Sequence, residues 1–469
     1  MKKEHVHLVG IGGTGMAALA GLLKENGMKV SGSDMEVYPP ISTILREMNV
    51  EAKKGFRKEN LIPPPDVAVI GNVVNRGNEE AEYILDNQIE YRSMPEMIKE
   101  RFLRGKHSIV VAGTHGKTTT ASLLSWIFTC AGTDPGFLVG GIPKNFGKNY
   151  HFGSGRFFII EGDEYETAFF DKGPKFMHYM PRTLVLGTIE YDHADIYKSL
   201  DEVVLQFKRL VNIVPQSGHI VCCWESENVK EAVSKSFSMV EPFGFSSECF
   251  WKIASIEISP SWTEFDLYRD GRFLKRFRMK LPGRYNILNA TASIAVSLEN
   301  SIELNAVARA LESFEGTKRR FEIIGSCRNM TIIDDFAHHP TAIRETLKAA
   351  REKYPSSRIW ALFEPRSWSM RRNVFEHELA TSFADADEII IASVYRAEQL
   401  AEAERLDVGK VVSKLKQSGK KAAYINEGVD AIVKKLIEEL CEGDVVIMMS
   451  NGSFDSIYGK LLDKLSRKT

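Results

Sequence analysis

The sequence lacks a surplus of charge of either sign. Its 469 residues carry 61 Lys and Arg against 62 Asp and Glu, which gives a net charge of −1 at pH 7. Non-specific binding to nucleic acid or to an acidic membrane surface needs a surplus of basic residues. The composition therefore predicts no nucleic-acid partner. It is compatible with a local basic patch on the surface.

The sequence also lacks a long apolar run and a cysteine framework. No stretch reaches the ~18 apolar residues of a membrane-spanning helix, and glycines interrupt the apolar start at residues 6–23, unlike a signal peptide. Only 6 cysteines are present, and none forms a C-x-x-C motif. Reduced thiols of this kind are typical of a cytoplasmic protein. We expect no membrane partner, and no pattern predicts an oligomeric state.

Apolar strands alternating with helical patterns dominate what is present. A hydrophobic fraction of 43% is ample for buried cores, and this length suggests about three domains. The alternation predicts parallel sheets with right-handed crossovers. We expect three α/β domains, over residues 1–105, 106–316 and 317–469, with an antiparallel meander near residues 240–282 added to the central one.

The apolar runs predict where the strands lie. Helical patterns over residues 14–26 and 287–300 separate some of them. The expected strands cover residues 6–9, 29–32, 67–70, 108–112, 157–160, 183–186, 219–223, 331–333, 358–362, 388–392, 422–425 and 444–448.

A glycine loop follows the first expected strand. Residues 10–15 read GIGGTG, which fits G-x-G-x-x-G between a strand and a helix. Such glycines let the backbone approach a pyrophosphate, which then lies on the helix N-terminus. Asp34 follows the loop at about the sequence spacing at which dinucleotide-binding folds carry the acidic residue that binds the ribose. The loop alone indicates NAD, FAD or another diphosphate nucleotide, or glycines needed only for tight packing.

A second loop gives a stronger signal for ATP. Residues 112–119 read AGTHGKTT, after a buried strand and before a helix. The Gly-Lys-Thr core is that of a P-loop, in which backbone amides hold phosphate, the lysine reaches the β- and γ-phosphates and the hydroxyl binds Mg²⁺. Val111 departs from the full pattern, which has a glycine there. The expected ATP-binding residues are Gly113, Thr114, His115, Gly116, Lys117, Thr118 and Thr119.

Acids and imidazoles follow two strands of the central domain. Glu161 opens the run EGDE and His193 closes the run EYDH. Carboxylates beside a P-loop are natural Mg²⁺ ligands, and ligands bind at the carboxyl ends of parallel strands. Asn286 and Asn289 would share one helix face, unless Asn286 only caps the helix. Adjacent histidines at 338 and 339 invite a zinc interpretation, but sequence neighbours face different directions.

These segments together resemble the Mur ligase family, ATP-dependent amide-bond ligases of peptidoglycan assembly. The likeness rests most on residues 112–120 (AGTHGKTTT) and 334–340 (DDFAHHP) and covers nearly the whole chain. It implies Rossmann-like N- and C-terminal domains around a P-loop ATPase domain. It also implies a UDP-sugar, rather than NAD, on the first loop. The implied UDP-sugar residues are Gly12, Gly13, Thr14, Gly15, Asp34 and Asn72.

Within the family, the same two segments look like the branch acting on UDP-N-acetylmuramate. Segments 37–40, 71–78, 135–143 and 169–172 are similar to the member that attaches the tripeptide L-alanyl-γ-D-glutamyl-meso-diaminopimelate through an acyl phosphate. The alternative member adds L-alanine, and the stretch between residues 164 and 183 is longer than that enzyme needs. A nicotinamide oxidoreductase would not use the P-loop, and a non-catalytic nucleotide-binding regulator would not retain Lys117, Glu161 and His193.

The resemblance also implies roles for individual residues. Lys117 and Thr118 match the binders of ATP phosphate and Mg²⁺, and Glu161 and His193 match further metal ligands. The residues matching nucleotide contacts are Asn286 and Asn289, with Arg320 and Asp335 brought by the third domain. Lys208 stands where several members carry a carbamylated lysine, although this branch usually lacks it.

A polyanionic peptide substrate calls for basic residues on the third domain. Segment 364–372 (EPRSWSMRR) follows an expected strand and offers Arg366, Arg371 and Arg372 for carboxylates. A solvated basic loop is the alternative. Because an acyl phosphate must be kept from water, we also expect the third domain to close over ATP, with a hinge near residues 316–318.

Overall fold

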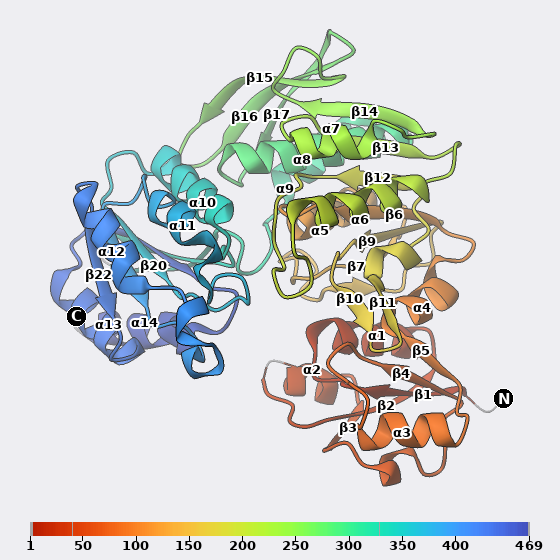
Figure 1. Ribbon diagram of the computed structural model, residues 1–469. Helices are drawn as coiled ribbons and strands as arrows, with labels where there is room; N and C mark the ends of the chain where they lie inside the picture. Colours follow the sequence, from red (N-terminus) through yellow and green to blue (C-terminus); the bar gives the residue numbers. More distant parts are fainter. Residues whose placement is uncertain (1–2, 40, 328, 468–469) are drawn as a thin grey trace.

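The computed structural model describes residues 3–39, 41–327 and 329–467. Pro40, which ends one of the segments named above, lies outside them. Three sheets occupy separate parts of the molecule: the first (red to orange) lies below the second (yellow to green), and the third (blue) lies to one side (Figure 1). Among the described residues, no helix is long and apolar enough to cross a membrane.

The first sheet has five parallel strands in the order β3-β2-β1-β4-β5. β1 is almost completely buried, which explains its apolar sequence. The strands are β1 (His5–Val9), β2 (Lys29–Asp34), β3 (Glu51–Lys54), β4 (Val67–Ile70) and β5 (Tyr91–Ser93), and the helices are α1 (Thr14–Glu25), α2 (Ile41–Glu47), α3 (Glu79–Asp86) and α4 (Met94–Ile98). The strands expected at 6–9, 29–32 and 67–70 are confirmed within two residues.

The second sheet has ten strands in the order β17-β16-β15-β14-β13-β12-β6-β9-β7-β8. β15 to β17 pair antiparallel, so the expected meander is confirmed. The strands are β6 (His107–Ala112), β7 (Gly136–Leu138), β8 (Tyr150–His151), β9 (Phe157–Glu161), β12 (Thr183–Leu186), β13 (His219–Cys223), β14 (Met239–Gly244), β15 (Trp251–Ile258), β16 (Thr263–Arg269) and β17 (Arg272–Met279).

Helices cover both faces of the parallel part of this sheet. Side chains of β6 alternate between two cores, Val110 in one and Ile109 and Val111 in the other. One core includes side chains of α6 (Leu200–Asn212) and α7 (Glu227–Val233), and the other those of α5 (Lys117–Cys130), α8 (Arg284–Glu299) and α9 (Leu304–Ser313). Burial on both faces explains why these strands read as continuous apolar runs.

A small hairpin in the same part of the chain as the second sheet packs against the first sheet. β10 (Glu166–Ala168) and β11 (Asp171–Pro174) pair antiparallel. Phe169 and Phe170 at its turn pack against the core of the first sheet, where the Phe170 and Tyr91 rings lie edge to face at 5.0 Å. The added length between residues 164 and 183 therefore forms a contact between two parts of the chain.

The third sheet has the order β18-β19-β23-β20-β21-β22. Five strands are parallel as expected, but β18 pairs antiparallel with β19 at one edge. The sequence of β18, EIIGSC, gives no clear strand signal. The strands are β18 (Glu322–Cys327), β19 (Met330–Asp335), β20 (Ile359–Phe363), β21 (Glu388–Ala392), β22 (Lys421–Ile425) and β23 (Val445–Met449), and the helices are α10 (Pro340–Lys353), α11 (Glu376–Thr381), α12 (Val408–Gln417), α13 (Val429–Glu439) and α14 (Ile457–Arg467).

The chain passes from the second sheet to the third through a short anchored segment. Gly316 has φ of +84°, and Thr317 forms an isolated antiparallel bridge with Pro143. The Lys318 amide donates to the Ile142 carbonyl at 2.9 Å. Each sheet falls within one expected domain, while the exact boundaries at residues 105 and 316 stay predictions.

Candidate active site

The loop between β6 and α5 requires glycine at two positions. Gly113 has φ of +127°, and a side chain there would lie 2.9 Å from the Gly187 backbone. Gly116 has φ of +79°, and its Cβ would lie 2.3 Å from Oδ1 of Asn289. The first turn of α5 contains no acidic residue. The backbone amides at the start of α5 therefore lie beside a tight loop, and no acidic side chain of the first helical turn lies next to them. This arrangement suits an anion.

Lys117, the first residue of α5, is held in a buried ion pair. Its Nζ lies 2.9 Å from Oε2 of Glu164 and 2.6 Å from the Gly113 carbonyl. Burial opposes the charge, but the carboxylates of Glu164, Asp163 and Glu161 raise the pKa of Lys117. A charged amine thus stands at the loop before any phosphate arrives.

Thr118 and Glu161 form a second polar contact beside the loop. The Thr118 hydroxyl donates to Oε1 of Glu161 at 2.8 Å, and the Gly140 amide donates to its Oε2 at 2.6 Å. Gly140 and Gly141 leave no room for side chains, since a Cβ on Gly140 would meet Glu161 and one on Gly141 would meet Thr118 and Thr317. A hydroxyl and a carboxylate are oxygen donors of the kind that Mg²⁺ prefers.

His193 faces the same acidic cluster. Its backbone has φ of +56°, and its Nε2 lies 3.2 Å from Oε1 of Glu164. Burial works against protonation, but the carboxylates of Glu164 and Asp192 raise the pKa of His193 to about 9. The structure thus joins Lys117 and His193 through one carboxylate, Glu164. Glu164 belongs to the same acidic run as Glu161, which is the sequence signal that could have identified it, yet Glu164 was not among the expected site residues.

Other loop residues connect to neighbouring segments. The Thr114 hydroxyl accepts from the Glu190 amide at 2.9 Å, His115 Nε2 lies 3.3 Å from Oε2 of Glu190, and Thr119 is buried. Asn289 Nδ2 donates to Oδ1 of Asn286 at 3.2 Å, so the pair shares one face of α8. Gly283, not Asn286, is the N-cap of α8, and the capping interpretation is wrong.

The third part of the chain reaches this site through two expected residues. Arg320 Nη2 lies 3.5 Å from the Thr118 hydroxyl. Asp335 accepts from the amides of Phe321 at 2.6 Å and Ala337 at 2.7 Å. Burial raises the pKa of Asp335, against the effect of the nearby Arg320 guanidinium. Asp335 therefore fixes the backbone next to Arg320 and the turn that follows β19.

The first glycine loop gathers its expected residues at one end of the first sheet. Asp34 Oδ2 accepts from the Gly12 amide at 2.8 Å. Thr14 and Gly15 open α1, whose N-cap Gly13 has no side-chain hydrogen bond and whose first turn has no acidic residue. Asn72 is exposed and follows Gly71, whose amide donates to Val9. The free helix N-terminus suits an anion.

The three arginines of segment 364–372 differ in exposure. Arg366 is partly exposed, and its guanidinium lies 3.7 Å from the centre of the Tyr395 ring. Arg372 lies 4.0 Å from the Trp368 ring and 3.4 Å from Glu404. Arg371 is only 6% exposed and contacts Gln399 and the Tyr395 carbonyl. Arg366 also lies 3.5 Å from Glu364. Arg371 is thus engaged within the protein, while Arg366 and Arg372 are partly exposed and each has one acidic partner.

Lys208 does not face the P-loop cluster in this structure. It lies on α6, and its Nζ forms a 2.6 Å ion pair with Glu231 on α7. The carbamylation hypothesis therefore gains no geometric support.

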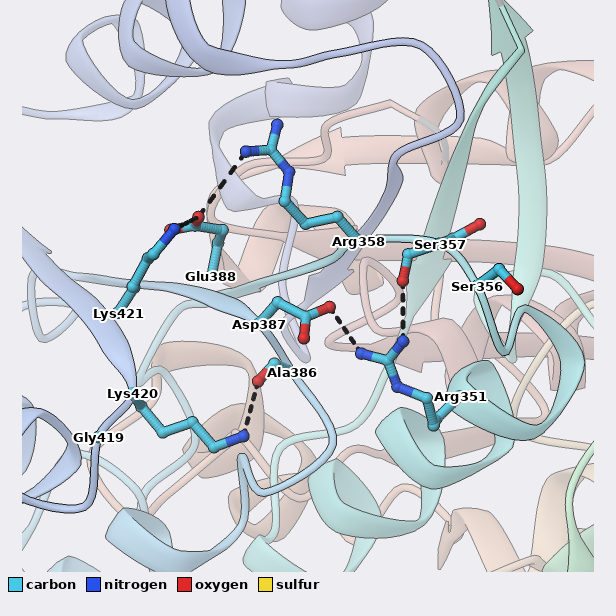
Figure 2. Close-up of a pocket in the computed structure, with 10 residues that line it drawn as sticks. All are labelled: Arg351, Ser356, Ser357, Arg358, Ala386, Asp387, Glu388, Gly419, Lys420 and Lys421. Atoms are coloured by element: carbon cyan, nitrogen blue, oxygen red, sulfur yellow. Dashed lines mark hydrogen bonds and ion pairs between the residues drawn. The ribbon is translucent and has the colours of Figure 1, made fainter.

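A cavity of ≈560 Å³ lies elsewhere, at the amino ends of β20, β21 and β22 (Figure 2). Its basic side chains already pair with acids: Arg351 with Asp387 at 2.6 Å and Lys421 with Glu388 at 3.0 Å. None of the expected site residues lines it. Since ligands bind at the carboxyl ends of parallel strands, the cluster around Lys117 remains the candidate site.

Three family profiles match successive parts of the chain. The profile described as "Mur ligase family, catalytic domain" matches residues 5–105, "Mur ligase middle domain" matches 111–297 and "Mur ligase, glutamate ligase domain" matches 319–452.

Individual proteins match along almost the whole chain. A UDP-N-acetylmuramate–L-alanyl-γ-D-glutamyl-meso-2,6-diaminoheptandioate ligase of Escherichia coli strain K12 is 38% identical over 99% of this chain and 98% of its own. A UDP-N-acetylmuramate–L-alanine ligase of Clostridium botulinum strain Loch Maree is 33% identical over 96% of both. The crystal structure of a murein peptide ligase from Psychrobacter arcticus 273-4 superposes with a TM-score of 0.73, at 33% identity over 98% of both chains. On these matches, the chain belongs to the Mur ligase family.

Proposed function

We propose that this protein joins the tripeptide L-alanyl-γ-D-glutamyl-meso-diaminopimelate to UDP-N-acetylmuramate at the cost of ATP. The observation that carries the proposal is the cluster of Lys117, Thr118, Glu161 and His193 beside a glycine loop, in a chain 38% identical to a ligase of that name. Such a reaction serves peptidoglycan recycling.

The residues at the second loop fit ATP and Mg²⁺. Gly113 and Gly116 keep the loop free of side chains, and α5 offers an uncapped N-terminus for phosphate. Lys117 would contact phosphate oxygens, while Thr118, Glu161 and His193 would hold the metal ion. Bound Mg²⁺ neutralises charge on the phosphates during transfer. Asn289 lies against this loop and Asn286 is hydrogen-bonded to Asn289, and both would contact the nucleotide together with Arg320 and Asp335.

The chemistry needs activation of a carboxylate. A lactyl carboxylate is a poor electrophile, and transfer of a phosphoryl group to it gives an acyl phosphate that the peptide amine can attack. Lys117 and Arg320 carry the positive charge that stabilises the transferring group. Glu164 holds the Lys117 amine in place at 2.9 Å. Closure of the third domain at residues 316–318 would exclude water.

The first loop would hold the UDP-sugar diphosphate. Gly12, Gly13, Thr14 and Gly15 surround the α1 N-terminus, and Asp34 fixes the loop through the Gly12 amide. Asn72 is exposed beside it. A nicotinamide dinucleotide is the remote alternative, and absence of any NADH fluorescence change on adding the protein would remove it.

A phosphate-release assay tests the choice of amine. The protein receives ATP, Mg²⁺ and UDP-N-acetylmuramate, and then either L-alanine or the tripeptide. We expect tripeptide-dependent release with at least a tenfold higher kcat/KM, about 1.4 kcal/mol at the transition state. Faster release with L-alanine would instead assign the alternative activity, and release with neither would reject both.

Arg366 is the proposed contact for peptide carboxylates, with Arg372 beside it. Arg366→Ala is expected to raise the KM for the tripeptide and to leave the KM for ATP unchanged, because only the peptide subsite loses a cation. Arg405→Ala in the same part of the chain serves as a control. An unchanged KM for the tripeptide would remove Arg366 from the proposal.

We also propose the domain limits and the location. Cuts at residues 105 and 316 separate the three sheets, so a fragment of residues 106–316 is expected to fold alone. All six cysteines are free thiols, two of them exposed, which suits the reducing cytoplasm. Nucleic acid and membranes have no part in the proposed reaction.

A further inference from the structure

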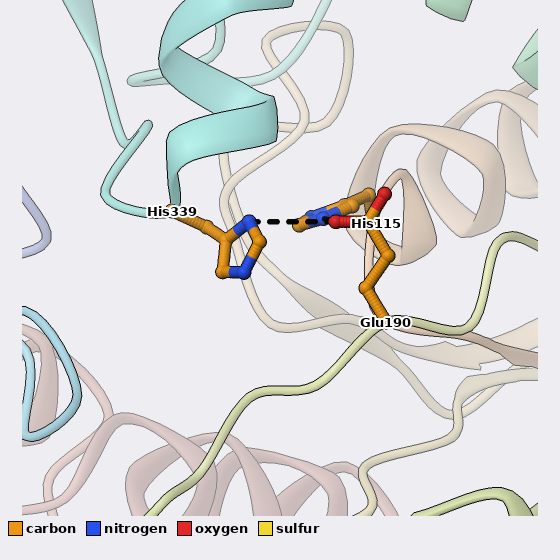
Figure 3. A group of neighbouring side chains, drawn as sticks. All are labelled: His115, Glu190 and His339. Carbon is orange, nitrogen blue, oxygen red and sulfur yellow. Dashed lines mark hydrogen bonds and ion pairs between the residues drawn. The ribbon is translucent and has the colours of Figure 1, made fainter. Parts of the chain in front are cut away.

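His115, Glu190 and His339 form a compact group beside the P-loop (Figure 3), and the proposed reaction gives Glu190 and His339 no role. His115 comes from the P-loop, Glu190 from the segment after β12, and His339 from the N-cap of α10. One ligand atom from each lies within 4.8 Å of the others. The group therefore gathers two imidazoles and a carboxylate from segments that belong to two different sheets.

The hydrogen bonds around His339 fix which ring nitrogen carries the proton. Nε2 lies 3.2 Å from the Tyr191 carbonyl, which can only accept, so Nε2 is the donor. Nδ1 carries no proton and accepts from the Thr341 amide at 3.3 Å, so a metal ion would take its single lone pair in place of this helix cap. A metal-bound histidine characteristically donates its second N–H to a backbone carbonyl in this way.

Nδ1 also lies close to a carboxylate oxygen. Oε2 of Glu190 lies 3.5 Å from Nδ1 of His339 and 3.3 Å from Nε2 of His115. Because the ring proton is on Nε2, no proton joins Nδ1 to Oε2. A cation bound among these atoms would replace a contact between two acceptors.

The carboxylate is oriented by a further residue. The Thr341 hydroxyl donates to Oε2 of Glu190 at 2.7 Å. His115 and Glu190 are partly exposed, whereas His339 is 6% exposed. Supporting hydrogen bonds on the ligands and one open side are what a metal site with an exchangeable position shows.

We propose that His115, Glu190 and His339 bind a divalent transition-metal ion, with Zn²⁺ the best match. Two imidazoles and one carboxylate are a zinc ligand set with a fourth position open to solvent or substrate. Mg²⁺ prefers oxygen ligands and is a poor match for two imidazoles. The site is separate from Thr118, Glu161 and His193, and it links the P-loop directly to the N-terminus of α10.

Direct titration tests the site without nucleotide or sugar. The metal-stripped full chain is titrated with Zn²⁺ against a chromophoric chelator. We expect one site per chain, weakened at least tenfold in His339→Ala, since loss of a ligand should cost no less than loss of a supporting contact. His377→Ala, an exposed histidine on α11, is the matched control and should bind as the parent does. Equal affinity of His339→Ala and the parent, or no tight site in the parent, overturns the proposal.

Two further measurements guard against misfolding and against confusion with the Mg²⁺ site. Zn²⁺ should raise the thermal midpoint of the parent and of Glu161→Gln, but not that of Glu190→Gln. Co²⁺ should give visible absorption bands that are lost in Glu190→Gln. If Glu161→Gln loses zinc binding while Glu190→Gln keeps it, the ion occupies the proposed Mg²⁺ ligands and the proposal fails. Because ATP is absent, this result is independent of the ligase activity.

Discussion

Glu164 holds the Lys117 amine between its two carboxylate oxygens, at 3.0 and 2.9 Å. The carboxylate is 2% exposed and the lysine 14% exposed, so the pair has lost most of its water. A buried ion pair of this kind is a weak contribution to stability, and breaking it leaves an uncompensated charge. At this site the ion pair matters because it already positions the Lys117 amine for an incoming phosphate.

Lys117→Ala should therefore abolish turnover. Removing a preorganised charge from a phosphoryl-transfer site costs on the order of 100-fold or more in rate. The measurement is ATP-, sugar- and peptide-dependent phosphate release. Lys230→Ala, which removes a lysine that contacts Glu227 and the Trp224 ring, is the control and should keep full activity. Retention of more than about a tenth of the activity by Lys117→Ala would contradict the P-loop assignment.

His107 gives a prediction for stability against pH. Burial, followed by Arg156 and Arg182, lowers its pKa to about 4 from an ordinary value of 6.5. The unfolded chain therefore binds more protons between pH 6.5 and 4, and stability falls as pH drops through this window. His107→Gln should lose less of its thermal midpoint between pH 7 and 4.5 than the parent does, whereas His377→Gln should follow the parent. Parallel curves for the parent and His107→Gln would refute this origin.

Helix α5 begins and ends at glycines with positive φ, and the two differ in their surroundings. Gly116 at the N-terminus has φ of +79°, with Asn289 within 2.3 Å of its missing Cβ. Gly132 beyond the C-terminus has φ of +74° and open space around it. Alanine would thus strain the backbone at both positions, but it would clash with a neighbouring side chain only at Gly116.

Gly116→Ala is expected to reduce kcat/KM for ATP at least tenfold, because the loop must move away from Asn289. Gly132→Ala should cost about 1 kcal/mol of stability through backbone strain and leave kcat/KM for ATP unchanged. Steady-state kinetics and thermal unfolding of both variants separate the two effects. An equal loss of kcat/KM in both variants would show that strain, rather than contact with Asn289, is responsible.

Buried parallel strands were the elements that the sequence predicted best. Val67–Ile70 and Thr183–Leu186 form strands at the residues expected, because burial on both faces demands an unbroken apolar run. The β10–β11 hairpin and β18 were not predicted. Their short, polar or glycine-containing sequences carry little strand signal and are held by pairing with the neighbouring strand of a hairpin, as Ala168 pairs with Asp171 and Glu322 with Asp334.

The candidate site was predictable where one loop supplies it. The Gly-Lys-Thr core identifies Lys117 and Thr118 from local sequence alone. Glu164 needed the fold, because only the packing of β9 beside β6 brings it to Lys117. The same holds for Glu190 and His339, which are 149 positions apart (339 − 190) and meet where the N-terminus of α10 contacts the segment after β12.

Contacts between the second and third sheets converge at the candidate site. Asp192 accepts from the Ser369 hydroxyl at 3.0 Å, Glu190 from Thr341 at 2.7 Å, and Arg320 lies 3.5 Å from Thr118. Beside these polar contacts, the Tyr191 ring lies 6.1 Å from the Phe375 ring of the third domain. Polar contacts are common between domains that also move relative to each other. The crossing at residues 316–318 is short enough to act as the hinge.

Small-angle scattering should therefore detect closure. We expect the radius of gyration to fall when a non-hydrolysable ATP analogue and UDP-N-acetylmuramate are added together, because ligands on both sides of the site favour the closed arrangement. Ser369→Ala should weaken this compaction without changing the radius of gyration measured without ligand. No compaction in the parent would contradict ligand-induced closure.

Gly141 lies between two closely packed neighbours. A Cβ there would lie 2.9 Å from a methyl group of Thr118 on one side and 2.9 Å from a methyl group of Thr317 on the other. The backbone of Gly141 therefore lies between the phosphate loop and the start of the third domain, beside the contact of Arg320 with Thr118. A displacement of Thr118 toward Thr317 would push on this backbone, because close-packed atoms do not compress. We therefore expect nucleotide binding at Thr118 to influence the orientation of the third domain partly through a residue that has no side chain.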